Sequence, residues 1–298
     1  MFEEFKNAFN RYNNAHVQLI IINVVVFLVM VVITVVATVS QFPEIADWLH
    51  LQVAIPAPFF AYIVKPWTII TYAFVHDLGS IFHILFNMLF LYWFGKLFVE
   101  YLGSDKLVAV YILGALAGGV AYLLVYNFIP FFMERAPLLG MIGASAAVYA
   151  IVVATATLLP DYTFFLLFLG PVRIKYIAAF YIVLSLLGTI QANAGGNIAH
   201  LGGALIGFVY IKQLQAGVNW GGWITATIDF FKGLFKPRLK VKVSYRNENT
   251  SAKSAPKQKG PSISQAEIDA ILDKISDGGY ESLTKEEKDK LFNASKKQ

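Results

Sequence analysis

The sequence contains no cysteine, which excludes disulfide bonds, thiolate nucleophiles and cysteine-based zinc sites. Charge is also scarce: 14% of the 298 residues are charged, where a soluble domain has about 25%. Hydrophobic residues make up 57% of the chain. Most Lys and Arg residues follow position 216, and such a basic tail favours anionic lipid headgroups over nucleic acid as a partner. The composition therefore indicates an integral membrane protein.

Six apolar stretches have the length that a bilayer requires, because a hydrocarbon core of ~30 Å needs about 20 helical residues. They lie at 17–39, 81–99, 107–128, 141–159, 172–190 and 198–214. The first is too long for the apolar part of a signal peptide, and no clear cleavage site follows it, so we interpret it as an uncleaved helix. The sequence therefore predicts an all-α polytopic protein with a bundle of six transmembrane helices over residues 1–216.

The basic residues outside these stretches indicate the orientation in the membrane, since short cytoplasmic loops are rich in Lys and Arg. With six spans, both chain termini and the basic tail lie on the same side. The other side holds only two basic loop residues, Lys65 and Arg135. The side of the termini holds Lys6, Arg11, Lys96, Lys106, Arg173, Lys175 and Lys212. We expect a multi-pass protein of the cytoplasmic (inner) membrane with both termini in the cytoplasm.

Two further segments follow the last span. Residues 217–261 are predicted to form an interfacial amphipathic segment over 218–235, rich in Trp and Phe, and then a basic linker over 236–261. Residues 262–298 are predicted to form a cytoplasmic helical hairpin. Ser264-x-x-Glu267 and Thr284-x-x-Glu287 have the pattern of helix capping boxes. This hairpin is a candidate docking element.

Polar residues from three spans are expected at one depth in the membrane. Spans two, four and six all begin on the external side, and the polar residues lie near these starts: His83 and Asn87, Ser145, and His200. At a rise of 1.5 Å per residue, all four lie within roughly 10 Å of the outer edge of the bilayer core. Because polar residues inside a membrane are costly, their convergence indicates a functional site.

Each of these residues also has an ordinary structural interpretation. A Ser among small residues commonly packs between helices, and a His at a membrane edge can reach for water. A His and an Asn one helical turn apart can form a simple helix contact. The combination favours chemistry because the G-x-x-x-G face of Gly203 and Gly207 lies on the same side of span six as His200.

A matching stripe of small residues on span four consists of Ala146, Ala150 and Ala154. Close approach of spans four and six would bring the hydroxyl of Ser145 to His200, as a nucleophile and its base require. His83 and Asn87 could then donate hydrogen bonds to the oxyanion of a tetrahedral intermediate.

At these residues the chain resembles the rhomboid intramembrane serine proteases, over about residues 60–215. The matching elements are His83-x-x-x-Asn87, Gly143-x-Ser145 and Ala199-His200-x-x-Gly203-x-x-x-Gly207. We expect the glycines Gly143, Gly203 and Gly207 to serve in helix packing. The resemblance implies a dyad without a carboxylate, in which Ser145 is the nucleophile and His200 the general base. It also implies an oxyanion hole formed by His83, Asn87 and the backbone N–H of Ser145, and a Tyr149 ring that stacks on the catalytic His.

Two positions differ from the pattern of that family. Ala146 stands where the family usually has Gly, and we expect an ordinary helical position there because residues 145–159 read as continuous helix. The Trp-Arg pair of the family's first external loop is replaced by Lys65-Pro66-Trp67-Thr68, which keeps the Trp only.

The predicted function is that of an intramembrane serine endopeptidase that cuts single-span membrane-protein substrates near the external face. A His with a reference pKa of about 6.5 suits the proton exchange near neutral pH. No metal or organic cofactor is implied, and His16, His50 and His76 are too scattered in sequence to suggest a metal site. The sequence indicates no oligomeric state.

Two alternatives stay open. The first is a catalytically inactive rhomboid-like protein that binds membrane clients, for which Ala146 is the support. The second is a small transporter, with Asn23, Ser145 and His200 along a path through the bundle. Against the transporter, the polar groups lie at one face of the membrane, and no paired helix interruptions mark a repeat.

Overall fold

The computed structural model describes residues 13–166, 169–235 and 264–295. The chain forms two compact units, residues 1–237 and 238–298, which are described separately. Lys6, Arg11 and the expected linker at 236–261 lie outside the described residues. The finer division into 1–216, 217–261 and 262–298 stays a prediction.

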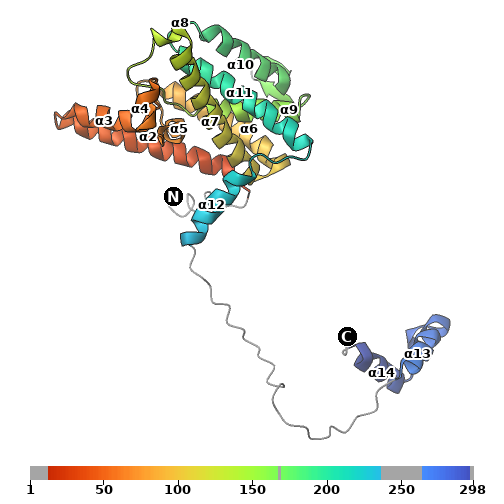
Figure 1. The fold of residues 1–298 in the computed structure, drawn as a ribbon. Coiled ribbons are helices and arrows are strands. Elements are labelled where there is room, and N and C mark those ends of the chain that lie inside the picture. Colours follow the sequence, from red (N-terminus) through yellow and green to blue (C-terminus); the bar gives the residue numbers. More distant parts are fainter. Residues whose placement is uncertain (1–12, 167–168, 236–263, 296–298) are drawn as a thin grey trace. The chain divides into compact units, whose positions relative to one another are not determined.

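An apolar helix occurs in each of the six expected stretches of the first unit (Figure 1). Four of the six, α2, α6, α7 and α11, are long and apolar enough to cross a membrane, while α9 and α10 are shorter. The prediction of an all-α polytopic bundle is confirmed. The six helices are α2 (Ala15–Val39), α6 (Ile81–Leu102), α7 (Ser104–Phe128), α9 (Ser145–Leu158), α10 (Ile174–Gly188) and α11 (Ala194–Gln215).

Helix α9 occupies the centre of the bundle, in contact with α6, α7, α10 and α11. Its sequence is apolar on every face, as a fully enclosed helix requires. Glycines on the neighbouring helices allow the backbone of α9 to approach closely. A Cβ atom on Gly114 of α7 would lie 2.9 Å from Cα of Ala147, and one on Gly207 of α11 would lie 2.9 Å from Cα of Ala150. The backbone of α9 is therefore in direct contact with α7 and α11.

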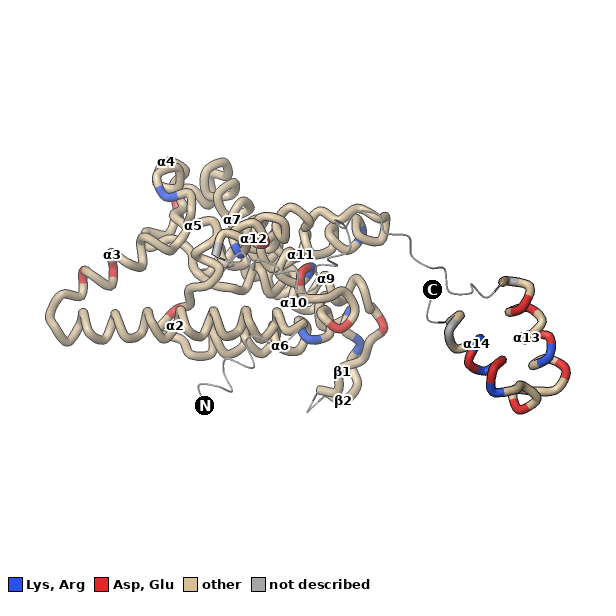
Figure 2. Tube along the Cα trace, turned by 90° about the horizontal axis from the view of Figure 1, so that it is seen from below, with Lys and Arg blue, Asp and Glu red and all other residues tan. Residues whose placement is uncertain are grey.

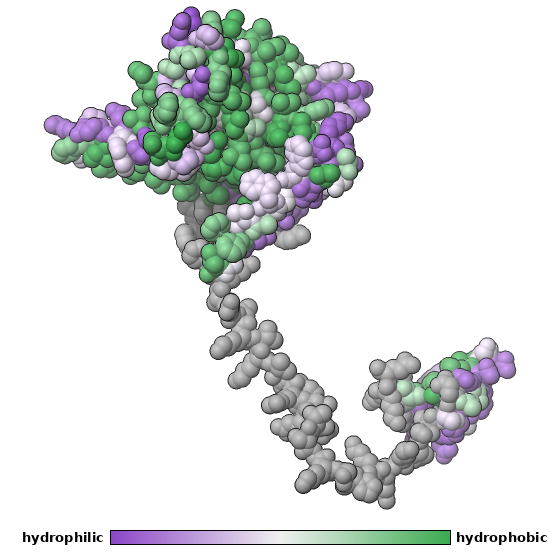
Figure 3. Space-filling view, viewed as in Figure 1, coloured by the Kyte–Doolittle hydropathy of each residue, from purple (hydrophilic) through white to green (hydrophobic). Residues whose placement is uncertain are grey.

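The surface of the bundle is largely hydrophobic over the helices, with hydrophilic residues towards its ends (Figure 3). Large apolar side chains from several helices are exposed there, including Val32, Phe82, Leu187 and Leu205. A contiguous apolar surface of this kind is unsuited to water. It matches the acyl chains of a bilayer.

The connection between α2 and α6 contains α3 (Pro43–Val53), α4 (Phe59–Ile63), α5 (Thr68–Thr71) and a 3₁₀ turn, η1 (Tyr72–Phe74). Side chains just before α5 are hydrogen-bonded to the end of α3. The indole Nε1 of Trp67 donates to the Gln52 carbonyl at 2.8 Å, and Nζ of Lys65 donates to the Leu51 carbonyl at 2.9 Å. This loop is therefore anchored without the Arg of the family pattern.

The segment before α10 differs from the expectation of continuous helix from residue 172. After α8 (Pro130–Met133) and α9, the chain forms an antiparallel hairpin of β1 (Thr163–Leu166) and β2 (Gly170–Arg173). Asp161 accepts hydrogen bonds from Lys175 at 2.7 Å and from Arg173 at 3.2 Å, and these charges lower the pKa of its carboxyl group. Short apolar runs do not distinguish strand from helix, which explains the missed hairpin.

Helix α12 (Gly222–Phe235) ends the described part of the first unit. Ile224 is buried, whereas Trp223, Phe230, Phe231 and Leu234 are exposed beside Lys232. One side of α12 thus contacts the bundle and the other presents aromatic and basic groups. This arrangement is typical of a helix that lies in a membrane interface.

The second unit is a helical hairpin of α13 (Gln265–Gly278), the 3₁₀ turn η2 (Tyr280–Ser282) and α14 (Lys285–Ser295). Both capping boxes are formed: the backbone N–H of Ser264 donates to Glu267 at 3.0 Å, and that of Thr284 donates to Glu287 at 2.7 Å. Figure 2 shows charged residues along both helices. The hairpin therefore has a charged surface, whereas the surface of the bundle is largely apolar.

Candidate active site

The start of α9 is set by loop contacts that hold the preceding residues extended. Met141 and Ile55 exchange backbone hydrogen bonds of 2.9 and 3.0 Å, and the Gly143 N–H donates to the Tyr72 carbonyl at 2.9 Å. Gly143 has φ of 136°, a conformation that side-chain-bearing residues rarely adopt. The helix then begins at Ser145.

The predicted role of Gly143 in helix packing is therefore wrong. This glycine lies in the extended turn before α9, where its missing side chain leaves space beside the site. A Cβ atom there would lie 3.1 Å from Cε1 of His83 and 3.5 Å from Oγ of Ser145. Residues 141–144 were expected to be helical, and they are not because the Ile55–Met141 bridge holds them.

Ser145 and His200 lie within hydrogen-bond distance, with 2.7 Å between Oγ of Ser145 and Nε2 of His200. The separation follows from the packing of α11 on α9. A Cβ atom on Gly203 would overlap the carbonyl oxygen of Ala146, so only glycine permits this approach. His200 lies one helical turn before Gly203, on the side of α11 that faces α9.

The other contacts of His200 come from Tyr149 and Ser185. The Tyr149 ring stacks on the imidazole, with 4.2 Å between ring centroids and 12° between planes. Oγ of Ser185, on α10, lies 3.1 Å from Nδ1 of His200. Sequence reasoning missed Ser185, since a single Ser in an apolar helix is a weak signal.

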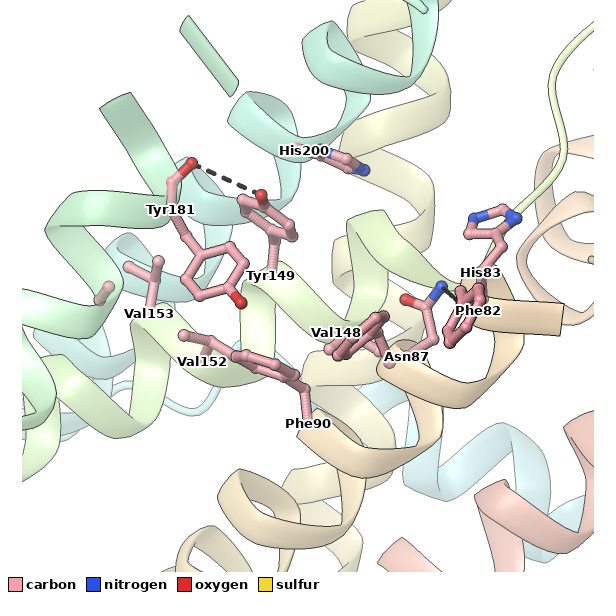
Figure 4. A pocket seen from close by; sticks show the side chains of 12 residues that line it. Phe82, His83, Asn87, Phe90, Val148, Tyr149, Val152, Val153, Tyr181 and His200 are labelled. Carbon is pink, nitrogen blue, oxygen red and sulfur yellow. Dashed lines mark hydrogen bonds between the residues drawn. The ribbon is translucent and has the colours of Figure 1, made fainter. Parts of the chain in front are cut away.

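His83 and Asn87 face the pair from α6, on the far side of the cavity from Tyr149 (Figure 4). Nδ2 of Asn87 donates to the His83 carbonyl at 2.8 Å, which uses one of its two N–H groups and leaves the other. The His83 ring contacts His76 edge-on, with 5.3 Å between centroids.

His76 is far from the candidate residues of spans four and six in sequence, yet its ring lies beside that of His83. It is buried in the loop before α6, outside the spanning helices. Burial, and then the nearby His83, lower the pKa of His76 to about 4. His76 is therefore neutral at physiological pH.

A cavity of about 420 Å³ opens beside these groups (Figure 4). Apolar side chains from α6, α9 and α10 form most of its wall, and His83, Asn87 and His200 add polar groups from α6 and α11. Such a combination is typical of a binding site for an apolar group. The lining residues are Phe82, His83, Phe86, Asn87, Phe90, Val148, Tyr149, Val152, Val153, Ala178, Tyr181 and His200.

Asn23, which the transporter alternative places with Ser145 and His200, lies elsewhere. It is buried, and its Nδ2 donates to the Leu19 carbonyl at 2.8 Å and to the Tyr111 hydroxyl at 3.1 Å. It does not line the cavity that His200 lines. Within the described ranges, no group of three or more His, Asp and Glu side chains is placed to hold a metal ion.

Comparison with known proteins identifies the family of this bundle. The sequence model of the rhomboid domain matches residues 64–215, slightly more than half of the 298 residues. The chain belongs to the rhomboid family. The rhomboid domain thus spans the helices from α5 to α11, including every residue around the cavity.

A relative of this rhomboid chain is RHOMBOID-like protein 12, mitochondrial, of Arabidopsis thaliana, which is 33% identical over 161 residues. The alignment covers 50% of this chain and 47% of the relative, so the chain matches less than half of that protein. Residues 262–297 match a second family, described as a family of unknown function (DUF6576). This match coincides with the hairpin of α13 and α14.

Proposed function

We propose that this rhomboid-family protein is an intramembrane serine endopeptidase with Ser145 as nucleophile and His200 as general base. The observation that carries the proposal is the 2.7 Å distance between Ser145 Oγ and His200 Nε2 at the edge of an apolar cavity. An adjacent base is what a serine hydroxyl needs to act as a nucleophile near neutral pH.

The proposed reaction begins when the Ser145 hydroxyl attacks the carbonyl carbon of a peptide bond and its proton passes to Nε2 of His200. The oxyanion forms close to the start of α9. The first backbone N–H groups of a helix have no partner within it, and its N-terminus carries partial positive charge. The Ser145 N–H, His83 and the remaining N–H of Asn87 are the proposed donors.

His200 then returns the proton to the leaving amine, and the acyl group stays on Ser145 Oγ. Water attacks the acyl carbon with His200 again acting as base, which releases the second product and restores the hydroxyl. The energy of oxyanion stabilisation is largest where water is excluded. An apolar cavity wall of Phe82, Phe86 and Val148 supplies such surroundings.

The proposed substrates are single-span membrane proteins, cut near their external ends, with the lipid bilayer as the other partner. The apolar surface of the bundle and the aromatic face of α12 support a bilayer setting. The distribution of Lys and Arg supports a cytoplasmic or inner membrane with both termini on the cytoplasmic side.

The test compares the purified chain with Ser145→Ala and His200→Ala on a model transmembrane substrate in detergent. The parent should cleave it, and each variant should lose at least about a thousandfold in kcat, since dyad members act as a unit. Cleavage that survives either substitution would contradict the dyad. Absence of cleavage by the folded parent over a broad substrate panel would favour the inactive client-binding protein.

A further inference from the structure

The imidazole of His200 has a polar partner on each ring nitrogen. Nε2 lies 2.7 Å from Ser145 Oγ, and Nδ1 lies 3.1 Å from Oγ of Ser185. Ser185 comes from a different helix, α10, and is 1% exposed. A neutral imidazole carries one proton, so one of its nitrogens donates and the other accepts. Nε2 of His200 can take the Ser145 proton only if the imidazole's own proton is on Nδ1.

The last acceptor in the chain of hydrogen bonds that continues from Ser185 determines the direction of each bond in it. A hydrogen-bonded chain runs from Ser185 Oγ to the Tyr149 hydroxyl at 2.9 Å, and from that hydroxyl to the Tyr181 carbonyl at 3.4 Å. Figure 4 shows the last of these contacts. A carbonyl oxygen can only accept. The Tyr149 hydroxyl therefore donates its single proton to Tyr181 and must accept from Ser185.

Ser185 can only accept a hydrogen bond from His200. Its only hydroxyl proton is donated to Tyr149, so its oxygen can only accept from the imidazole. The proton of neutral His200 is then on Nδ1, and Nε2 keeps the lone pair that faces Ser145. The backbone carbonyl of Tyr181 thus sets the tautomer of His200 through two hydroxyl groups.

The arrangement differs from the usual behaviour of a serine in a membrane helix. Such a hydroxyl commonly donates to the backbone carbonyl four residues earlier on its own helix. For Ser185 that carbonyl belongs to Tyr181, and it accepts from Tyr149 instead. The Ser185 hydroxyl is thereby directed away from its own backbone and towards Tyr149 and His200.

We propose that Ser185 is a positioning residue that holds His200 in the Nδ1–H tautomer, by accepting from Nδ1 within a chain of hydrogen bonds that ends on the Tyr181 carbonyl. The inference rests on the proposed function, in which His200 is the base. When Ser145 attacks, its proton binds to Nε2, and the Nδ1 proton stays donated to Ser185. No proton moves along the chain, and Ser185 provides the orientation that a carboxylate provides in a catalytic triad.

The decisive measurement is nitrogen NMR on the full chain in detergent, labelled with ¹⁵N in its five His residues. The His200→Ala variant assigns the His200 signals by difference. At a pH where His200 is neutral, the parent should show a protonated Nδ1 and an unprotonated Nε2. The Ser185→Ala variant should show a mixture of both tautomers, because nothing then selects Nδ1 as the donor.

The kinetic counterpart separates positioning from substrate binding. Ser185→Ala should lower kcat about tenfold, the effect expected for losing one neutral hydrogen bond, with KM changed by less than about twofold. Ser185→Thr keeps the hydroxyl and should recover most of kcat. Tyr149→Phe should have the smaller effect, because Ser185 can then donate to the Tyr181 carbonyl itself and still accept from His200.

The matched control is Thr155→Val. Thr155 is a fully buried hydroxyl on α9 that donates to the Ile151 carbonyl at 2.7 Å, within its own helix. Its removal should cost comparable folding stability and leave kcat and the His200 tautomer unchanged. A loss of activity in Ser185→Ala that arose from folding alone would appear in both variants.

Two results would overturn the proposal: an unprotonated Nδ1 on His200 in the parent, or a Ser185→Ala variant with the parent's tautomer and kcat. The second could occur while the parent still cleaves its substrate, in which case the proposed function stands and the role of Ser185 alone is excluded. The first would also contradict Nε2 of His200 as the base. Conversely, a folded parent that cleaves nothing would contradict the proposed function. The NMR signals of His200 would still decide the role of Ser185, since they do not depend on turnover.

Discussion

Helices α9 and α10 both contribute to the surroundings of His200, but they contact the rest of the protein differently. In α9, ten of fourteen residues are buried, against four of fifteen in α10. Phe180, Leu186 and Leu187 of α10 are each 59% exposed. Ser145, the proposed nucleophile, thus begins an enclosed helix, and His200, the proposed base, receives a second contact from a helix whose surface is mostly exposed and apolar.

The comparison shows two ways to fix the geometry of the candidate site. The separation of Ser145 and His200 depends on backbone contact, because Gly203 and Gly207 let α11 meet the carbonyls of α9. The contact from α10 depends on hydroxyl groups, those of Ser185 and Tyr149. We expect substitutions in the first interface to affect folding and activity together, and those in the second to affect activity more than folding.

The largest effect is expected for Gly203→Ala, because the added Cβ would overlap the carbonyl oxygen of Ala146. Overpacking of this kind costs about 3 kcal/mol of folding free energy, and it would move His200 away from Ser145. Thermal unfolding in detergent and a cleavage assay measure the two effects. Leu186→Ala, on the exposed side of α10, is the control and should cost less than about 1 kcal/mol. Equal costs in the two variants would contradict the close backbone contact of α11 with α9 at Gly203.

The next effect in size is expected for Gly143→Ala. At φ of 136° a side chain costs about 1–3 kcal/mol, and its Cβ would press on the His83 ring. We expect kcat to fall at least about tenfold, as for loss of an oxyanion-hole donor, with a smaller change in KM. If this variant keeps the parent's kcat, the turn before α9 does not position His83 for the reaction.

The smallest effect is expected for Ala146→Gly, which introduces the residue that the family usually has. Ala146 is helical and buried, and its methyl group fits against Gly118 of α7. A glycine should lower folding stability by about 1 kcal/mol and leave kcat within about twofold. A kcat that rises well above the parent's would show instead that Ala146 limits the activity.

The helices of the bundle were predictable because the length and apolar character of a spanning segment are properties of the local sequence. The start of α9 was not, since tertiary contacts hold the residues before Ser145, through the Ile55–Met141 bridge and the Tyr72 carbonyl. The hairpin of β1 and β2 was missed because its apolar strand reads equally well as helix.

The candidate site was predictable in part, for a related reason. Ser145, His200, His83 and Asn87 could be placed at one depth from the order and direction of the spans. The contact of Ser185 with His200 depends on the rotation of α10 about its axis, which no residue spacing reports. His76 contacts His83 because of the path that the loop before α6 takes, and helical periodicity does not predict the path of a loop.

The most direct test of the central claim is to treat the folded protein with a fluorophosphonate and to locate the adduct by mass spectrometry of its peptides. The account predicts an adduct on Ser145, formed far more slowly in His200→Ala because the base is missing. A folded protein without an adduct on Ser145, or one labelled there equally fast without His200, would contradict it.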